Sequence, residues 1–364
     1  MKMRAAVLRE IPGKLEIDDV EIGSPGPREV LIRTAAAGLC HSDLHFMEGK
    51  YYWMLPVVLG HESSGIVESV GDQVTYVKPG DHVITCLSVY CGNCEYCLTG
   101  HLSLCDNKAA VQRPLDDESR LTQNGQPMWQ FFDVSSFAEY MLVHENAVAK
   151  IREDMPLDKA ALIGCSVTTG VGAVFNTAKV EPGTTVAVLG CGGIGLNCIQ
   201  GAALAGAAKV IAVDMVPSKL DLAKQFGATH TVNAAEGDAV SQVKELTGGG
   251  VHYSFEAIGL KKTAEQAFAM LRRGGAATVI GMVPMNETVE VPGFELLLEK
   301  KLQGSNMGSN RFRVDMPRLI DLYLDGRLKL DELVSRRIRL DEVNDGFDAM
   351  RSGEIARSVI IFDS

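Results

Sequence analysis

The chain has 364 residues, of which 46% are hydrophobic and 22% are charged, a composition typical of a globular protein with about two domains. Its formal net charge is −11 and its pI is about 5.3, which argues against nucleic acid or an anionic membrane surface as its main partner. No run of 18 apolar residues occurs and the opening "MKMRAAVLRE" leads into no apolar segment. We therefore expect no signal peptide, no membrane span and a cytoplasmic location, where most of the nine cysteines would stay reduced.

The first half of the chain is rich in short strand patterns separated by Gly and Pro turns. "SPGPREVLIRTAAAG" and "VGDQVTYVKPGDHVI" are examples, and such spacing predicts a β-rich domain over residues 1–166. The charged stretch "RPLDDESRLTQNGQP" is interpreted as a solvated loop.

Three possible metal ligands lie far apart in this half: Cys40 in "GLCHSD", His61 in "GHESSG" and Cys165 in "IGCSVTTG". Two thiolates and one imidazole form a catalytic zinc pattern that leaves a fourth position open. Asp43 could accept the other ring N–H of His61, and Glu62 could approach the metal. Taken singly, each ligand has an ordinary alternative, since buried cysteines are commonly small hydrophobes.

Four cysteines, Cys91, Cys94, Cys97 and Cys105, follow the spacing C-x2-C-x2-C-x7-C in a loop-like context. This spacing favours a closed structural zinc site, which holds a loop but has no position for substrate. An iron–sulfur cluster is the main alternative, and a redox couple would leave two cysteines unused.

Residues 184–195, "TTVAVLGCGGIG", combine a buried strand pattern with a G-x-G-x-x-G motif that opens a helix pattern. The cofactor-binding candidates of this motif are Gly190, Gly192, Gly193, Ile194 and Gly195. A second strand pattern ends at Asp214, which lies 19 residues after the last glycine. Glycines at a helix N-terminus let backbone N–H groups approach a pyrophosphate, and an acid at this distance binds a ribose 2′-OH. The carboxylate would repel a 2′-phosphate, so the pattern favours NAD over NADP; Lys219 could contact the same ribose.

Strand and helix patterns continue to alternate up to "ELLLEKKLQGSNMG". The alternation predicts an α/β fold with a Rossmann-type doubly wound parallel sheet beside the β-rich domain. We predict a catalytic domain over 1–166 with the cysteine lobe at about 90–106, a dinucleotide-binding domain over 167–306, and a return to the first domain over 307–364.

Together, "GLCHSD", "GHE", the four-cysteine loop, "IGCSVTTG", "GCGGIG" with its Asp, and "GFDAMRSGEIARSVIIF" resemble the zinc-containing medium-chain alcohol dehydrogenases. The likeness runs nearly end to end. It implies a GroES-like catalytic domain, a Rossmann domain, an active site in the cleft between them, and two zinc ions per chain. It also implies a homodimer or homotetramer.

By this resemblance, Ser42 would take the alcohol proton and pass it through the nicotinamide ribose to His45. His41 and Arg357 would lie near the cofactor pyrophosphate, and Thr169 would pack on the nicotinamide together with the motif isoleucine. The resemblance further implies an aromatic substrate pocket, with these residues: Tyr51, Trp53, Leu87, Phe131 and Phe132.

The implied reaction is reversible hydride transfer between an alcohol and NAD, giving an aldehyde or ketone. We expect a primary alcohol of the medium-chain aliphatic, aromatic or terpenoid kind. The long loop after Cys105 also resembles that of thiol-dependent formaldehyde dehydrogenases, which hold the S-hydroxymethyl adduct with an Arg where this chain has Ala109; Arg113 could substitute. A non-catalytic zinc- and NAD-binding relative is a minor alternative.

Overall fold

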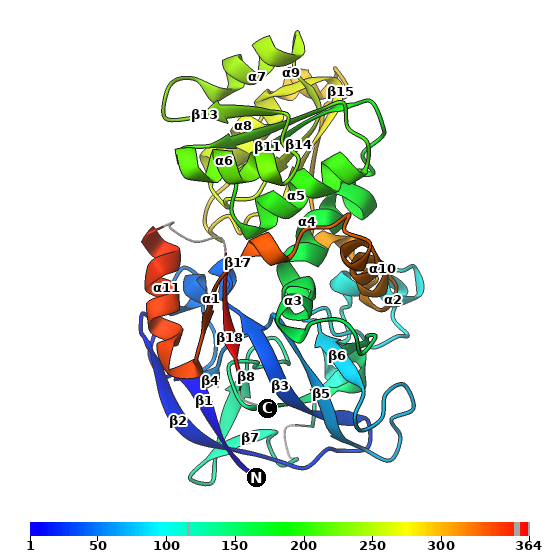
Figure 1. Cartoon of the computed structure of the whole chain (residues 1–364), viewed down its shortest axis with the longest axis vertical. Coiled ribbons are helices and arrows are strands. Elements are labelled where there is room, and N and C mark those ends of the chain that lie inside the picture. Colours follow the sequence, from blue (N-terminus) through cyan, green and yellow to red (C-terminus); the bar gives the residue numbers. More distant parts are fainter. Residues whose placement is uncertain (115–116, 353–356, 363–364) are drawn as a thin grey trace. The chain divides into compact units, whose positions relative to one another are not determined.

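The computed structural model describes residues 1–114, 117–352 and 357–362 (Figure 1). Residues 353–356 of the closing motif and residues 115–116 of the charged stretch lie outside this range. The chain forms two compact units: unit 1 comprises Met1–Cys165 and Arg311–Ser364, and unit 2 comprises Ser166–Asn310.

Unit 1 contains a small closed barrel and a seven-stranded sheet. The barrel strands, in spatial order, are β1 (Lys2–Leu8), β2 (Leu15–Ile22), β7 (Leu121–Gln123), β8 (Gln126–Gln130) and β4 (Val57–Val58). The sheet strands, in spatial order, are β10 (Val148–Lys150), β6 (His82–Thr85), β5 (Ser63–Val70), β3 (Glu29–Gly38), β18 (Arg357–Ile361) and β17 (Val334–Ile338), with β9 (Tyr140–His144) paired to β3. This β-rich architecture agrees with the fold predicted for the first half.

Part of the predicted solvated loop is instead a barrel hairpin. β7 and β8 pair antiparallel around Asn124 and Gly125, whose φ values of 51° and 75° suit the tight turn that Asn-Gly favours. Leu121 and Met128 bury their side chains in the barrel core. The interpretation as a loop was wrong here because the many charged residues outweighed a short strand pattern.

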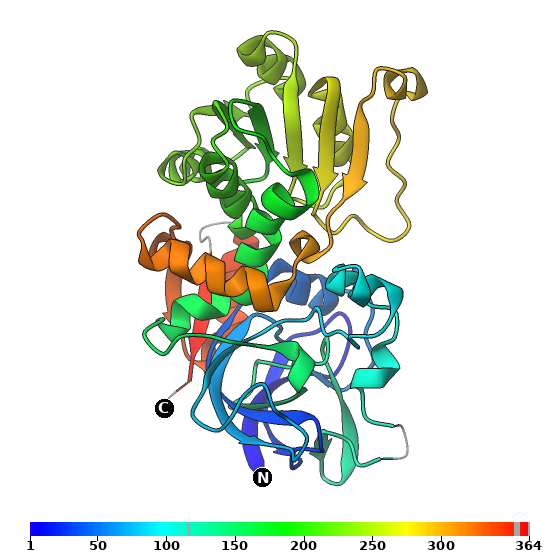
Figure 2. The same cartoon turned by 90° about the vertical axis from the view of Figure 1, so that its right-hand side faces the viewer.

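The helices of unit 1 range from four to 13 residues and lie mainly towards one end of the unit (Figures 1 and 2). They are α1 (His41–Met47), α2 (Glu95–Leu98), α3 (Leu157–Leu162), α10 (Phe312–Leu324) and α11 (Val343–Ser352). A cluster of mostly valine side chains, among them Val30, Val67 and Val143, fills one region of the core, as expected for β-branched residues on a pleated surface.

Unit 2 is a six-stranded parallel sheet. Its strands, in spatial order, are β13 (His230–Asn233), β12 (Lys209–Asp214), β11 (Thr185–Leu189), β14 (Val251–Glu256), β15 (Leu271–Val279) and β16 (Lys301–Gly304). Its helices are α4 (Thr168–Gly172), α5 (Gly193–Leu204), α6 (Pro217–Gln225), α7 (Ala239–Thr247), α8 (Lys261–Ala269) and α9 (Gly293–Leu296). This strand order is that of dinucleotide-binding folds, so the predicted fold class is confirmed.

One element of unit 2 has different bounds from those predicted. The helix expected over "TAEQAFAMLRRGG" ends with α8 at Ala269, and strand β15 begins at Leu271. Leu271 pairs with Val251, and an irregularity in the pairing follows at once. The strand therefore starts before the two glycines that were expected to end the helix.

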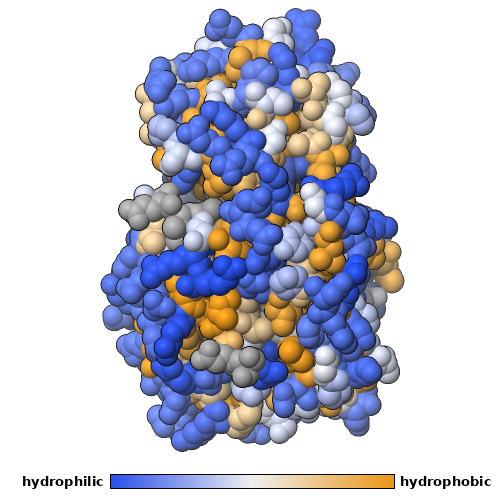
Figure 3. Space-filling model, in the orientation of Figure 1, coloured by the Kyte–Doolittle hydropathy of each residue, from blue (hydrophilic) through white to orange (hydrophobic). Residues whose placement is uncertain are grey.

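A continuous helical run from Leu157 to Ala178 is apolar and long enough to cross a membrane by composition alone. Because 83% of its most apolar window is buried, it is a core helix. Its windings at Ile163–Val167 and Ala173–Ala178 are π-helical. Hydrophilic residues cover most of the molecular face in Figure 3, in keeping with the net charge.

Candidate active site and metal centres

The three distant ligands converge in unit 1. Cys40 ends the link from β3 and immediately precedes α1, His61 lies between β4 and β5, and Cys165 lies in the first π-helical winding. All three are buried, and their ligand atoms lie within 4.8 Å of one another. Cys165 Sγ is 3.4 Å from His61 Nε2. Two sulfurs and one imidazole nitrogen at this spacing fit a zinc ion with an open fourth position.

The charges around these ligands favour a thiolate. A hydrogen bond with Cys165 and, against the opposing effect of burial, the charge of Arg357 hold the pKa of Cys40 well below its usual value. The pKa of Cys165 is raised by its hydrogen bond with Cys40 and by burial. A lowered thiol pKa favours the thiolate form, which is the form that binds a metal cation.

Asp43 helps to hold the ligands His61 and Cys40 in place through its carboxylate. Its carboxylate is fully buried and lies 3.3 Å from His61 Nδ1. It also accepts hydrogen bonds from the backbone N–H groups of Gly60, at 3.1 Å, and Cys40, at 3.2 Å. With Nδ1 facing a carboxylate, Nε2 is left to face the metal.

Glu62 and Arg357 form a buried ion pair at 3.6 Å beside the same group. Arg357 is 3% exposed and donates a hydrogen bond to the Leu39 carbonyl. A side chain on Gly38 would lie within 3.0 Å of Glu62, so glycine makes room for this carboxylate. Contact of Arg357 with a cofactor phosphate stays a prediction.

The predicted proton-relay residues lie on α1. Ser42 Oγ is 3.6 Å from the ligand atom Cys40 Sγ, and its role in proton transfer stays a prediction. His45 is half-buried, burial lowers its pKa, and its Nδ1 has no partner among the described residues. His41 is the exposed first residue of the helix.

An aromatic cluster lies against His61. The ring centroids of Phe131 and Phe132 are each 5.8 Å from the His61 ring. Trp53 contacts both, with centroids 5.1 and 5.0 Å away. Phe46, which the sequence did not single out, contacts all three of these rings and Tyr51.

Of the remaining predicted pocket residues, Leu87 is half-buried after β6, and Tyr51 is half-buried with its ring 6.3 Å from that of His45. The place of Phe46, next to a predicted relay histidine on an amphipathic helix, was the only signal for it. Ring contacts across the sequence could not be inferred from one-dimensional spacing.

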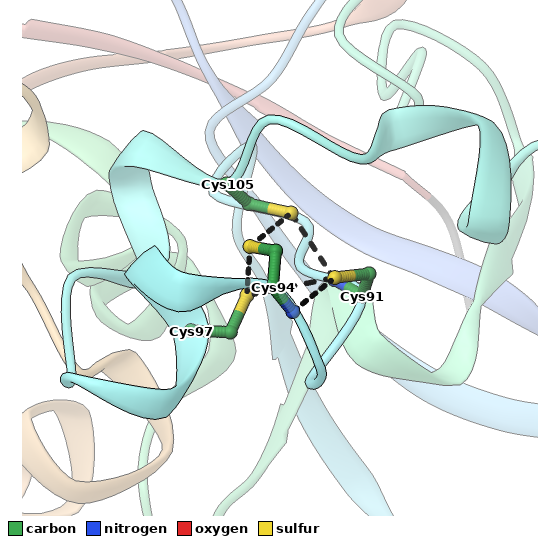
Figure 4. Close-up of side chains that lie close together, drawn as sticks. All are labelled: Cys91, Cys94, Cys97 and Cys105. Carbon is green, nitrogen blue, oxygen red and sulfur yellow. Dashed lines mark hydrogen bonds between the residues drawn. The ribbon is translucent and has the colours of Figure 1, made fainter.

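The four-cysteine loop forms a second group, drawn in Figure 4. Its sulfur atoms lie within 4.8 Å of one another, and neighbouring pairs are 3.4, 3.8 and 3.9 Å apart. Four sulfurs at 2.3 Å from one tetrahedral zinc would be about 3.8 Å apart. All nine cysteines are free, and these separations are far longer than the roughly 2.05 Å of a disulfide. In an iron–sulfur cluster with four cysteine ligands the thiolates are divided among two or four irons, which holds at least some of the sulfurs further apart.

Backbone hydrogen bonds in the lobe also stabilise the thiolate form of Cys91. The N–H groups of Asn93 and Cys94 donate to Cys91 Sγ, and the first of these bonds is the main reason why the pKa of Cys91 falls to about 7. Burial raises the pKa of Cys97 to about 12. Four cysteine sulfurs would fill all four coordination positions of a tetrahedral zinc ion. No position would stay open for a substrate, as expected of a structural site.

The glycine motif lies at the carboxyl end of β11 in unit 2. A side chain on Gly195 would lie 1.7 Å from the Gly190 carbonyl oxygen, so the turn requires glycine. Gly192 caps α5 and Gly193 begins it, which leaves N–H groups for an anion. Asp214 ends β12 and accepts hydrogen bonds from Cys191 N at 2.8 Å and from Val216 N at 3.0 Å.

Three further predicted cofactor residues, Ile194, Lys219 and Thr169, belong to unit 2, whereas His41 and Arg357 lie in unit 1. Ile194 is half-buried in the first turn of α5, and Lys219 is half-buried in α6. Thr169 is buried in α4, with its Oγ1 3.4 Å from Met307 Sδ. Their contacts with a nicotinamide or ribose stay predictions.

Two family models match the chain: the alcohol dehydrogenase GroES-like domain over residues 26–153 and the zinc-binding dehydrogenase over residues 193–325. Among curated relatives, an alcohol dehydrogenase class-3 of Cereibacter sphaeroides is 40% identical over the full length of both chains. An S-(hydroxymethyl)glutathione dehydrogenase of Paracoccus denitrificans is 39% identical, also over both full lengths.

Among solved structures, benzyl alcohol dehydrogenase from Acinetobacter calcoaceticus has a TM-score of 0.94 at 34% identity and covers both chains fully. A putative zinc-binding dehydrogenase from Sinorhizobium meliloti, bound to NADP, has a TM-score of 0.84 at 30% identity over both full chains. The fold, the two cysteine-containing groups and the full-length identity agree: the chain belongs to the zinc-containing medium-chain alcohol dehydrogenases, nicotinamide-dependent oxidoreductases that act on CH–OH groups.

Proposed function

We propose that this enzyme oxidises apolar primary alcohols, aromatic ones in particular, to aldehydes with NAD, reversibly and without a thiol. The observation that carries this proposal is the aromatic cluster, in which Trp53, Phe131 and Phe132 lie around the metal ligand His61. Flat apolar surface next to a metal ligand suits a benzyl or terpenoid alcohol.

The surroundings of Arg113 support substrates that carry no thiol adduct. Its guanidinium binds the buried Glu29 through Nε, at 3.0 Å, and through Nη2, at 2.5 Å. It also donates to the carbonyls of Glu118 and Ser24, at 2.8 Å each. An arginine with its donors committed in this way is poorly suited to hold an adduct carboxylate, and the exposed Ala109 offers no charge.

Different residues of the chain would bind the metal and transfer the proton during alcohol oxidation. A zinc ion held by the three buried ligands supplies a Lewis acid, which makes an alcohol hydroxyl more acidic. The Ser42 hydroxyl would accept the alcohol proton while it releases its own proton towards His45, which would pass a proton to water. A nicotinamide cofactor held at the glycine motif and Asp214 would supply the acceptor for the carbon-bound hydrogen as a hydride, with its two electrons.

The cofactor assignment to NAD rests on Asp214, whose carboxylate ends β12 beside the glycine motif. A negative charge there disfavours a 2′-phosphate. We expect Asp214→Gly to lower the ratio of kcat/KM for NAD over NADP by about tenfold or more. An unchanged ratio in steady-state kinetics would contradict the ribose role.

A second candidate function is the oxidation of an S-(hydroxymethyl) thiol adduct, which forms from formaldehyde and a thiol. It is favoured by the near 40% identity with relatives named alcohol dehydrogenase class-3 and S-(hydroxymethyl)glutathione dehydrogenase. The two candidates differ in the charge of the substrate, so one experiment separates them.

That experiment measures initial rates of NAD reduction with ethanol, hexanol, cyclohexanol, benzyl alcohol and geraniol, and with formaldehyde plus glutathione. We expect turnover of benzyl alcohol, geraniol or hexanol without thiol. Turnover only with formaldehyde and thiol would overturn the proposal, and Arg113→Ala would then show whether this arginine holds the adduct.

We also propose a cytoplasmic homodimer or homotetramer. The nine free cysteines fit a reducing compartment. In unit 2, Met285, Phe294 and Leu297 are 79%, 72% and 78% exposed, more apolar exposure than a monomer usually leaves around one segment. Light scattering of the purified protein tests the assembly state.

A further inference from the structure

The turn at residues 131–135 has an unusual backbone beside the metal ligand His61. Phe132, Asp133 and Ser135 have φ values of 49°, 59° and 57°, a left-handed conformation that side chains with a Cβ rarely adopt. Such strain persists only where surrounding contacts hold it, and it gathers at functional sites. The contacts that hold this turn therefore indicate what it does.

One hydroxyl closes the turn and ties it to the barrel. Ser135 Oγ accepts a hydrogen bond from Phe131 N at 2.8 Å and donates one to the Val58 carbonyl at 2.7 Å. Ser135 is 1% exposed, so water does not compete for either bond.

The residues that follow fix the turn to the segment that carries the ligand. Ser136 N donates to the Gly60 carbonyl and Phe137 N to the Leu59 carbonyl, each at 3.0 Å. A side chain on Gly60, whose φ is 92°, would lie 2.6 Å from Phe137 N. The turn and the ligand His61 therefore keep a fixed spacing.

The two phenylalanines at the start of the turn form much of the aromatic cluster. Both rings are 5.8 Å from the His61 ring, and their own centroids are 4.3 Å apart. A change in the turn would move Phe132, which is half-buried, more easily than Phe131, which is fully buried.

We propose that Ser135 is a positioning residue for substrate selection. Its hydroxyl holds the strained turn so that Phe132, together with Trp53, presents a fixed aromatic surface beside the metal ligands. This surface favours flat aromatic alcohols over short aliphatic ones. The inference rests on the proposed function and adds to it the residue that sets the preference.

The test compares Ser135→Ala with Ser136→Ala, because Ser136 is equally buried but its Oγ has no partner among the described residues. We expect Ser135→Ala to lower the ratio of kcat/KM for benzyl alcohol over ethanol by roughly three- to tenfold, mainly through KM for benzyl alcohol. Ser136→Ala should keep the wild-type ratio, and both variants should keep the wild-type zinc content.

A second measurement follows the aromatic surface without any substrate. The chain has two tryptophans, so Trp129→Phe leaves Trp53 as the only tryptophan, which can be excited selectively over the tyrosines. In this background, Ser135→Ala should shift the Trp53 emission and increase its quenching by acrylamide, and Ser136→Ala should do neither. If Ser135→Ala does not fold, Ser135→Gly replaces it, since glycine accepts a positive φ.

The measurements distinguish a failure of the proposed substrate from a failure of the proposed role of Ser135. A wild-type enzyme that does not oxidise benzyl alcohol contradicts the proposed substrate, and the fluorescence result alone then decides the role of Ser135. Wild-type oxidation of benzyl alcohol, with an unchanged ratio and unchanged emission in Ser135→Ala, overturns the role of Ser135 and leaves the proposed function intact.

Discussion

The three-ligand group collects Cys40, His61 and Cys165 from three separate segments of unit 1, whereas the four-cysteine group takes all its ligands from residues 91–105. The ligands of the first are buried and are supported by the carboxylate of Asp43. In the second, Cys91 and Cys94 are half-buried, and supporting hydrogen bonds come from backbone N–H groups.

This difference indicates, for each site, whether the protein positions the metal or the metal organises the protein segment. The fold holds the three-ligand group in place, so its geometry depends on strands and helices that form without a metal. The lobe contains little regular structure, since α2 has four residues, and it is attached through Tyr90, whose ring packs on Phe312. We infer that a metal organises the lobe, as in small zinc modules.

Loss of a ligand from the three-ligand group should abolish catalysis and leave the fold intact. We expect Cys40→Ser to lower kcat/KM by more than about a thousandfold, with one zinc per chain in place of two and an unchanged circular dichroism spectrum. Cys86→Ala, which changes a buried cysteine outside both groups, is the control. Normal zinc content with normal turnover would remove Cys40 from the ligand set.

Asp43 offers a test of the support behind the ligands. We expect Asp43→Asn to weaken zinc binding at the three-ligand group by about 10–100-fold, because the amide is a poorer partner for His61 Nδ1 and lacks the charge. Competition with a chelator measures the affinity, and the lobe zinc should stay bound. Asp106→Asn, an exposed change next to the lobe, should alter neither site.

Loss of a ligand from the four-cysteine lobe should lower stability and leave catalysis almost unchanged. These effects are the opposite of those expected at the three-ligand group. Cys97→Ser should release one zinc and lower the melting temperature by about 10 °C, while turnover per folded molecule at 25 °C stays close to that of the wild type. Thermal unfolding and zinc analysis of the same sample measure both. A variant that lost turnover but not stability would contradict the assignment of a structural role.

The buried Glu29 shows how unit 1 is held together without any metal. It binds Arg113 and Arg120, and although burial alone would raise its pKa, these arginines lower it to about 2. A depressed carboxyl pKa stabilises the fold at pH values above the unfolded pKa, and this contribution is lost as the pH falls from about 4.5 through about 2.

We therefore expect Glu29→Gln to lower the free energy of unfolding by about 3 kcal/mol at pH 7 and by progressively less below pH 4.5. Urea unfolding of the wild type and the variant at pH 7, 4 and 3 measures the difference. Glu153→Gln, an exposed change, should have little effect at any pH. An equal loss at all three pH values would mean that the charge of Glu29 does not matter.

The fold was largely predictable because its signals are local. Strands β11 and β12 of unit 2 are short runs rich in β-branched residues between turns, and the spacing of "GCGGIG" and Asp214 fits only a few structures. The β7–β8 hairpin was missed although its Asn-Gly turn is a known signal, since the surrounding charges suggested solvent. One of those charges is buried: Arg120 is 6% exposed and pairs with Glu29.

The site was predictable only in part. Ligand identities came from residue types and from family resemblance, but no local signal could reveal that Phe46 contacts Phe131 or that Arg357 pairs with Glu62. The strained turn at 131–135 contains no glycine, so nothing in its composition predicts a positive φ. Contacts between distant segments impose that conformation.

The π-helical winding at Ile163–Val167 has a consequence for the effect of length changes in this segment. Each residue of an α-helix turns the chain by about 100°, and a π winding accommodates one residue more than an α winding over the same rise. Cys165 lies within this winding, so removing one residue upstream would rotate its sulfur about a quarter turn away from His61. A one-residue deletion in this helix upstream of Cys165 is therefore expected to release the zinc of the three-ligand group.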